Sequence, residues 1–354
     1  MKKTKVGVLG ATGAVGQRFV QLLDGHPWFK LAAVAASERS AGRSYGDACA
    51  WKLDTPMPAA ARALVVQPTE PKLDCDVVFS ALDANVAGPA EEAFAAAGCA
   101  VLSNARNHRM AEDVPLLVPE VNPDHAALIA VQRKKRGWKG FIATNPNCST
   151  ATLVLALAPL QRSFGVTAVA VTTLQAISGA GYPGIPALDI VGNVVPFIAG
   201  EEEKIERETQ KILGRLNSGA VEPLAAVVSA QTTRVPVVDG HTESVFVTLA
   251  RDPGLDAVRD AFRSFRGVPQ ERHLPSAPEH PVLLLDAEDR PQPRLDIGLE
   301  RGMASVVGRV RACPLMGYKF VVLGHNTIRG AAGAAILNAE LLQAEGFLSG
   351  SGSD

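Results

Sequence analysis

The feature that most restricts the fold of this chain is a glycine-rich turn near its amino terminus. A short apolar run, Lys5 to Leu9, leads directly into Gly10-Ala11-Thr12-Gly13-Ala14-Val15-Gly16. Apolar residues then recur at helical spacing until Gly25-His26-Pro27 ends the pattern. Glycines at such a strand-to-helix turn let backbone N–H groups approach a pyrophosphate. The spacing is a variant of the dinucleotide fingerprint; an ordinary tight turn is the alternative.

Further short apolar runs repeat the strand-and-helix alternation. They are Leu31 to Ala36, Asp76 to Ser80 and Ala100 to Ser103, with a helix-like stretch from Pro89 to Ala97. Strands that alternate with helices favour an α/β fold with a doubly wound parallel sheet. We therefore expect a Rossmann-type sheet over roughly the first 145 residues.

The second half of the chain has a different pattern. Val- and Thr-rich runs at 168–176, 225–233 and 243–249 tend to alternate, as in a half-exposed mixed sheet. A Gly- and Pro-rich loop from Ser178 to Pro196 is long enough to favour a binding or subunit-contact role. The Ala-rich stretch from Gly330 to Leu342 is typical of a helix that could close back on the first domain. At about 150 residues per domain, 354 residues suggest two domains.

Charge and cysteine content exclude several classes of protein. The 35 basic and 36 acidic residues give a net charge of −1, which removes the electrostatic argument for nucleic acid. The basic run 133–136, with Lys139, is expected to be a solvated loop. The five cysteines are scattered and odd in number, so neither a disulfide framework nor a zinc site is expected.

No targeting or membrane segment is recognisable in the sequence. The first residues lack a long apolar core, and no stretch reaches roughly 18 uninterrupted apolar residues. We therefore expect a cytoplasmic protein. The Ser- and Gly-rich residues 349–354 are expected to form a flexible tail.

The end of the second expected strand bears on the type of dinucleotide. Ser37, Arg39 and Ser40 follow it, and hydroxyls with a cation suit the extra phosphate of NADP. Glu38 is an acidic residue of the kind that holds the ribose of NAD. The balance favours NADP, and a solvated loop is the alternative.

Cys148 is the strongest candidate for a catalytic residue. It follows Asn145-Pro146-Asn147 and precedes Ser149-Thr150, so it should lie at a helix N-terminus. Unpaired N–H groups and the helix dipole there favour a thiolate and should lower the pKa of the thiol. The same N–H groups, with the Asn147 side chain, could hold an oxyanion. The other four cysteines lack comparable polar flanks and are interpreted as buried small residues.

His241 is the candidate proton acceptor. It follows Asp239-Gly240, a tight turn expected to present the imidazole rather than bury it. Arg234 precedes it by seven residues, and its planar fork suits a carboxylate. Four other histidines are expected in surface loops: His26, His125, His273 and His280. The run Gly200-Glu201-Glu202-Glu203-Lys204 opens an amphipathic helix, where helix-dipole preference alone could explain the acidic residues.

Together these segments make the chain resemble the aspartate-semialdehyde dehydrogenase family, in its archaeal and fungal branch. The resemblance extends to about Leu342 and depends on several motifs in order. They are Gly-Ala-Thr-Gly-Ala-Val-Gly (10–16), Ser-Asn-Ala-Arg-Asn-His-Arg-Met (103–110), Asn-Pro-Asn-Cys-Ser-Thr (145–150), Gln-Ala-Ile-Ser-Gly-Ala-Gly (175–181), Gly-Glu-Glu-Glu-Lys (200–204) and Arg-x6-His (234–241).

The resemblance implies an NADP-binding Rossmann domain, residues 1–147 and 324–348, and an α+β catalytic and dimerisation domain with a mixed sheet, residues 148–323. It implies Cys148 as nucleophile and His241 as acid and base. Gln175 would orient the acyl group, Arg234 and Glu201 would bind the substrate carboxylate and amino group, and Arg109 and Lys204 would bind phosphate. The implied cofactor contacts also include Ser80, Ser178, Gly179 and Asn326.

The implied reaction is the NADPH-dependent reductive dephosphorylation of L-aspartyl 4-phosphate to L-aspartate 4-semialdehyde through a Cys148 thioester, in the biosynthesis of aspartate-family amino acids. No metal is needed. The expected partners are this small substrate, phosphate and further copies of the chain, as a homodimer or homotetramer. The alternatives are a malonyl-CoA reductase or an N-acetyl-glutamyl-phosphate reductase on the same scaffold, but Glu201 favours a substrate with a free amino group.

Overall fold

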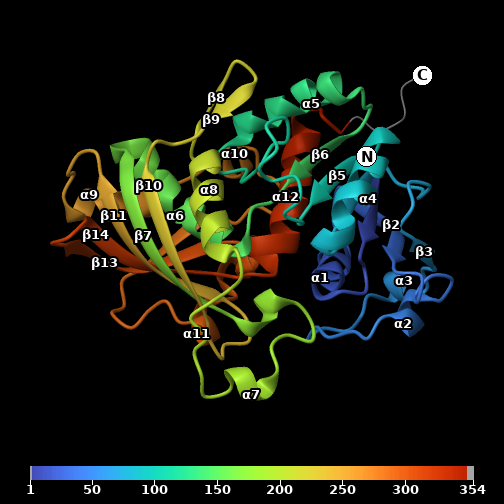
Figure 1. Cartoon of the computed structure of the whole chain (residues 1–354), viewed down its shortest axis with the longest axis horizontal. Coiled ribbons are helices and arrows are strands. Elements are labelled where there is room, and N and C mark those ends of the chain that lie inside the picture. The colour runs from blue at the N-terminus through green and yellow to red at the C-terminus, as the bar shows by residue number, and fades with distance from the viewer. Residues whose placement is uncertain (1, 349–354) are drawn as a thin grey trace.

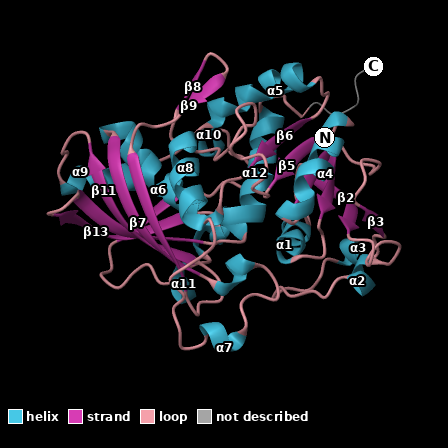
Figure 2. Cartoon of the chain, in the orientation of Figure 1, coloured by secondary structure: helices cyan, strands magenta, loops and turns pink. Residues whose placement is uncertain are grey.

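The computed structural model describes residues 2–348, and its first half is built on a parallel sheet (Figures 1 and 2). The six strands have the order β3-β2-β1-β4-β5-β6. They are β1 (Thr4–Leu9), β2 (Phe29–Ala36), β3 (Val66–Pro68), β4 (Val77–Ser80), β5 (Ala100–Ser103) and β6 (Phe141–Thr144). Every pairing is parallel, and all four residues of β4, β5 and β6 are buried, as in a sheet covered on both faces. The strand order reverses beside β1, where doubly wound sheets bind their ligands.

Helices connect these strands. They are α1 (Ala14–Leu22), α2 (Tyr45–Ala48), α3 (Ala59–Arg62), α4 (Ala84–Ala96), η1 (Pro123–Ala127) and α5 (Leu128–Arg136). The basic run 133–136 is the last turn of α5, so its prediction as a loop was wrong. Cations are favoured at this helix end, and Gly137 closes the helix in a left-handed conformation.

The second half of the chain forms a mixed sheet, as predicted. Its order is β10-β7-β11-β14-β13-β12, with β10 parallel to β7, β12 parallel to β13, and antiparallel pairs between them. The strands are β7 (Val166–Gln175), β10 (Val227–Arg234), β11 (His241–Leu249), β12 (Val282–Leu285), β13 (Ser305–Cys313) and β14 (Gly317–Gly324), and a separate hairpin contains β8 (Arg215–Asn217) and β9 (Ala220–Glu222).

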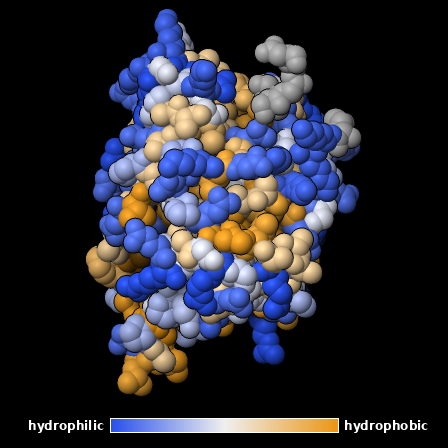
Figure 3. All heavy atoms as spheres, turned by 90° about the vertical axis from the view of Figure 1, so that its right-hand side faces the viewer, coloured by the Kyte–Doolittle hydropathy of each residue, from blue (hydrophilic) through white to orange (hydrophobic). Residues whose placement is uncertain are grey.

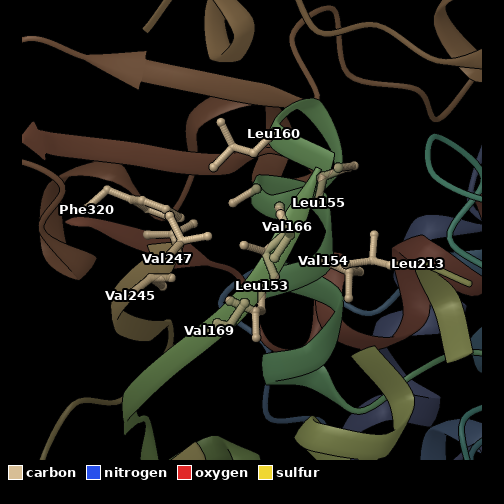
Figure 4. Packing of buried hydrophobic residues seen from close by; sticks show 14 of the residues in the cluster. Leu153, Val154, Leu155, Leu160, Val166, Val169, Leu213, Val245, Val247 and Phe320 are labelled. Atoms are coloured by element: carbon tan, nitrogen blue, oxygen red, sulfur yellow. The ribbon is translucent and has the colours of Figure 1, made fainter. Parts of the chain in front are cut away.

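The core of this half lies between the mixed sheet and α6 (Cys148–Phe164). Figure 4 shows Leu153 and Leu160 of α6 beside Val169 of β7, Val247 of β11 and Phe320 of β14. Residues 149–160 of α6 are all buried. A helix that is apolar on every side must lie inside the protein, so the core fixes α6 and the cysteine at its first residue.

The remaining helical elements connect or cover the two sheets. They are η2 (Ile177–Ala180), α7 (Ala187–Ile190), α8 (Glu201–Ile212), α9 (Leu255–Ser264), α10 (Val268–Glu271), α11 (Pro293–Asp296), η3 (Leu299–Gly302), η4 (Ile328–Ala332) and α12 (Gly333–Ala344). In residues 2–348 no helix combines the length and apolarity needed to cross a membrane.

The last helix returns to the first sheet (Figure 1). Ile336 and Leu342 of α12 share a hydrophobic cluster with Val6 of β1 and Phe29 of β2. This contact agrees with the expected return of the chain, while the domain boundaries at 147 and 324 stay a prediction. The predicted tail, 349–354, lies outside the described residues.

Candidate active site

Cys148 is the first residue of α6, and its sulfur meets an imidazole. The Asn147 side chain caps the helix by accepting from the N–H groups of Ser149 and Thr150, at 2.9 and 3.3 Å. Cys148 Sγ lies 3.1 Å from His241 Nε2. The structure thus brings together the two residues that the sequence had singled out for nucleophilic chemistry.

His241 is held in a defined position and tautomer. It is the first residue of β11 and is fully buried. The prediction that the preceding turn would expose the imidazole rather than bury it was therefore wrong. The Ala176 N–H donates to His241 Nδ1 at 3.0 Å. Because Nδ1 accepts, the proton of the neutral imidazole lies on Nε2, the nitrogen that faces sulfur. Burial, with a smaller contribution from Arg234, lowers the pKa of His241 to about 3.

The thiol of Cys148 does not have the lowered pKa that the helix N-terminus led us to expect. Burial, and then the nearby Glu201 carboxylate, raise its pKa to about 12. Arg109, Arg234 and the Ser149 N–H act in the opposite direction but do not outweigh them. Desolvation disfavours the charged thiolate more strongly than the helix end favours it. With these neighbours the cysteine is therefore a thiol at neutral pH.

The Glu201 carboxylate, near the cysteine, accepts hydrogen bonds from several side chains of the site. Its Oε1 accepts from Asn147 Nδ2 at 2.6 Å and Gln175 Nε2 at 3.2 Å, and its Oε2 lies 3.0 Å from Lys204 Nζ. Although burial opposes ionisation, Lys204 and these donors lower the pKa of Glu201.

The two neighbouring glutamates point elsewhere. Glu202 accepts from the Thr232 N–H, and Glu203 pairs with Arg207 on the surface. Of the three acidic residues, Glu201 is the one placed at the cysteine.

Gln175 and Arg234 end adjacent strands and are paired in register. Both are buried, Gln175 donates to the Ser149 hydroxyl, and Arg234 Nη1 donates to the Ala176 carbonyl at 2.8 Å. A Cβ at Gly179 would lie 2.8 Å from Arg234 Nη1 and 2.9 Å from His241 Cε1. Only glycine allows the loop after β7 to lie so close to both side chains.

The predicted cofactor residues beyond the glycine turn form two groups. Asn326 Nδ2 donates to the Ser178 hydroxyl at 2.7 Å, and Asn326 Oδ1 accepts from the Gly240 N–H at 2.9 Å, which places them next to His241. Ser80 ends β4 and is fully buried beside Glu91.

In the predicted nucleotide-binding turn, Gly10 has φ +73°, and a Cβ there would lie 2.6 Å from the Ala81 carbonyl. Gly13 caps α1 without any side-chain hydrogen bond, so the first N–H groups of α1 have no side-chain cap. Ser37, Arg39 and Ser40 follow β2, as predicted.

Two of the four histidines predicted in surface loops are buried. His26 pairs with Glu340 at 2.8 Å, and His125 lies 2.9 Å from Asn122 Nδ2. The partner of His26 is distant in the sequence, and that of His125 lies inside the same turn. The polar residues next to each histidine in the sequence do not reveal this burial.

Arg109 reaches the site from the first half of the chain. Its Nη1 lies 3.0 Å from Glu208 of α8, and Glu208 also accepts from the Asn147 N–H. Glu208 and Lys211 were not predicted as site residues. Their signal is their spacing, because Glu201, Lys204, Glu208 and Lys211 follow one another by three, four and three residues on one face of α8.

Comparisons with known proteins match this site and fold. Residues 5–129 match the family model of the semialdehyde dehydrogenase NAD binding domain, and residues 157–329 match that of the semialdehyde dehydrogenase dimerisation domain. The aspartate-semialdehyde dehydrogenase of Methanothermobacter thermautotrophicus is 54% identical over 341 residues, covering 95% of this chain and 98% of that protein. The Cryptococcus neoformans enzyme is 51% identical, covering 97% and 98%.

A solved structure agrees with these relatives. The crystal structure of aspartate semialdehyde dehydrogenase with NADP from Candida albicans has a TM-score of 0.90 and 47% identity, covering 98% of this chain and 99% of that one. This chain belongs to the aspartate-semialdehyde dehydrogenase family.

Proposed function

We propose that the chain reduces L-aspartyl 4-phosphate to L-aspartate 4-semialdehyde with NADPH, releasing phosphate, in the biosynthesis of lysine, methionine and threonine. The observation that carries this proposal is the 3.1 Å approach of Cys148 Sγ to His241 Nε2 at the start of α6. A thiol beside an imidazole at a helix N-terminus suits acyl transfer. The names of the relatives support the choice of substrate.

The charges around the sulfur fit the groups of this substrate. Arg234 suits the α-carboxylate because its planar fork can donate two parallel hydrogen bonds. Glu201 is a buried anion for the amino group, and Gln175 lies beside it to orient the acyl group. Arg109 and Lys204 are the cations proposed to bind phosphate.

The residues at the carboxyl ends of the parallel strands fit a dinucleotide. Gly10 permits the tight turn, and the uncapped N–H groups of α1 after Gly13 suit a pyrophosphate. Ser37, Arg39 and Ser40 would hold the 2′-phosphate of NADP, and Ser178, Gly179 and Asn326 would face the nicotinamide. Ser80 is buried and would act from behind this surface.

The chain's own residues then perform the acyl transfer. The sulfur of Cys148 attacks the acyl carbon: a C–S bond forms, the bond to the phosphate oxygen breaks, the thiol proton leaves on the released hydrogen phosphate, and a thioester remains. Nε2–H of His241 stabilises the thiolate, and a substrate ammonium at Glu201 offsets the charge that raises the thiol pKa. The N–H groups at the start of α6 can stabilise the oxyanion.

The reduction completes the cycle. When bound, NADPH supplies the hydride that reduces the thioester carbonyl. The tetrahedral thiohemiacetal on Cys148 collapses to the aldehyde as the C–S bond breaks. His241 passes its Nε2 proton to the departing sulfur, which restores the Cys148 thiol, and Nε2 takes a replacement proton from solvent.

The test is phosphate-dependent reduction of NADP with L-aspartate 4-semialdehyde, run beside malonate semialdehyde plus CoA. We expect turnover only with the first pair. Cys148→Ala should fold and lose activity by several orders of magnitude, whereas the control Cys313→Ala should keep it. Appreciable turnover by Cys148→Ala would refute the nucleophile.

We also propose that copies of the chain assemble as a homodimer or homotetramer in the cytoplasm. Large apolar side chains around α7 are exposed, including Leu188 at 97%, Val191 and Phe197. Figure 3 shows apolar atoms at the lower end of the molecule, the end at which Figure 1 places α7. A patch of this kind favours a protein contact, and the match to a dimerisation domain over 157–329 supports a second copy as the partner.

A further inference from the structure

Glu208 of α8 joins two parts of the site with one carboxylate. Its Oε1 lies 3.0 Å from Arg109 Nη1, and its Oε2 accepts from the backbone N–H of Asn147 at 2.6 Å. The side chain is 2% exposed. One buried anion therefore connects the guanidinium from the first half of the chain to the residue that caps the cysteine helix.

The rest of the Arg109 segment is also attached to α8. Lys211 Nζ donates to the carbonyls of Arg109, Ala111 and Val114, at 2.8, 2.9 and 3.1 Å. Burial lowers the pKa of Lys211 to about 8. These three hydrogen bonds fix the backbone around Arg109. The ion pair with Glu208 therefore acts on the orientation of the Arg109 side chain.

The orientation of Arg109 leaves part of its guanidinium available to a ligand. Nη1 is used by Glu208, and Nη2 donates to the Asn104 carbonyl at 2.7 Å. Nε is buried and has no hydrogen-bond partner among residues 2–348. A buried donor without a partner is costly in a folded protein, and an oxyanion would satisfy it.

We infer that Glu208 is a positioning residue that holds Arg109 toward the phosphate of the substrate and couples it to the cap of the Cys148 helix. This inference rests on the proposed phosphate role of Arg109. A buried cation that loses its anion must find another partner or become solvated, so the ion pair with Glu208 gives Arg109 one favoured orientation. Phosphate then binds to a guanidinium whose orientation is already fixed.

Glu208→Gln tests this directly, since it keeps the shape and removes the charge. In the phosphate-dependent oxidation of L-aspartate 4-semialdehyde, we expect KM for phosphate to rise roughly tenfold, the effect of losing one charge-assisted hydrogen bond. The KM values for NADP and for the aldehyde should stay within about twofold of wild type. The matched control is Glu203→Gln, which removes an exposed ion pair from the same helix and should change none of them.

A double-mutant cycle separates positioning from general destabilisation. If Glu208 acts through Arg109, the double variant with Arg109→Gln should have the same phosphate KM as Arg109→Gln alone. Additive effects, or an equal loss for all three ligands, would overturn the inference. Where turnover is too low, protection of Cys148 from iodoacetamide by inorganic phosphate gives the phosphate affinity instead.

The outcomes also distinguish this inference from the proposed function. An unchanged phosphate KM in Glu208→Gln, with a raised one in Arg109→Gln, overturns the inference alone. An unchanged phosphate KM in Arg109→Gln would show that Arg109 does not bind phosphate, and it would overturn the inference as well. Should Glu208→Gln not fold, Glu208→Asp, which keeps the charge but cannot span both partners, should show the same selective rise, and a uniform loss would contradict it.

Discussion

At the scale of single residues, the reactivity of Cys148 depends on the balance between burial and nearby charge. The helix N-terminus and two arginines favour the thiolate, but burial and Glu201 together outweigh them. Local sequence shows the helix end and not the desolvation, because the residues that surround the sulfur come from segments that are far apart in the sequence. The direction of the shift in the thiol pKa therefore could not be predicted from the residues next to Cys148 in the sequence.

Glu201→Gln should lower the pKa of Cys148, because it removes the one anion that raises it through charge. The rate of alkylation by iodoacetamide, followed against pH, should reach half its maximum at a lower pH than in wild type. At neutral pH the variant should also react faster, since a tenfold larger thiolate fraction accompanies a thiol pKa that is lower by about one. Glu202→Gln, one residue away and directed elsewhere, is the control; an identical profile for wild type and Glu201→Gln would contradict this account.

Glu243 offers a test of pH-dependent stability. It is fully buried two residues after His241, and neither carboxylate oxygen has a hydrogen-bond partner in the described part of the chain. Burial raises its pKa well above the ordinary value. The folded state thus keeps a proton that the unfolded state loses above about pH 4.3, so this group costs stability as pH rises toward its folded pKa.

Glu243→Gln removes that titration. Relative to wild type, the variant should gain free energy of unfolding between pH 5 and pH 8, with the larger advantage at the higher pH. Denaturant unfolding at both pH values measures the change. A constant difference between the two proteins would show that Glu243 does not titrate in this way.

At the scale of elements, the π-helix η4 packs closely against Cys148. Gly330 lies in η4, where a Cβ would be 2.6 Å from Cys148 Cβ and 3.0 Å from its Cα. Arg329 of the same turn is held by Glu120 through two hydrogen bonds, at 2.7 and 2.6 Å. The turn therefore has little freedom to move away from an added methyl group.

Gly330→Ala should displace Cys148 and reduce kcat by roughly tenfold or more, because overpacking of about 1–3 kcal/mol must be relieved at the nucleophile. Gly298→Ala is the control, since nothing lies within 4 Å of its Cβ position and its φ is −88°. Steady-state kinetics and thermal unfolding of both variants check this. Normal turnover by Gly330→Ala would mean that η4 does not fix the sulfur.

How far the sequence predicts these elements depends on whether their contacts are local or distant. The strand 100–103 was predicted at the bounds that the structure has, because buried parallel strands are short continuous apolar runs. The strands β12 to β14 were not predicted, since their pairing depends on contacts distant in sequence. Glu208 was not predicted for the same reason, because its partners Arg109 and Asn147 lie 99 and 61 residues away.

At the scale of the whole molecule, the two sheets meet through a few segments that cross between them. α12 packs on the first sheet, Arg109 reaches α8, and Lys52 lies 4.8 Å from the ring centroid of Tyr182 in the long loop after β7. The loop thus contacts the nucleotide half near α1 and exposes apolar residues further along. This arrangement links the cofactor side of the site to the surface proposed for assembly.

Leu188→Asp should weaken that assembly, because it places a charge among the exposed apolar side chains around α7. Sedimentation velocity should show a shift toward smaller species at micromolar concentration, with an unchanged fold by circular dichroism. Leu315→Asp, at another exposed leucine, is the control. An unchanged oligomer in Leu188→Asp would exclude α7 from the contact.

The most direct test of the whole account is the covalent state of Cys148. The protein is incubated with L-aspartate 4-semialdehyde and NADP without phosphate, quenched in acid and digested, and the mass of each cysteine peptide is measured. We expect an aspartyl thioester on the Cys148 peptide alone, which disappears when phosphate is added before the quench. An acyl group on another cysteine, or phosphate-dependent turnover with Cys148 unmodified throughout, would contradict it.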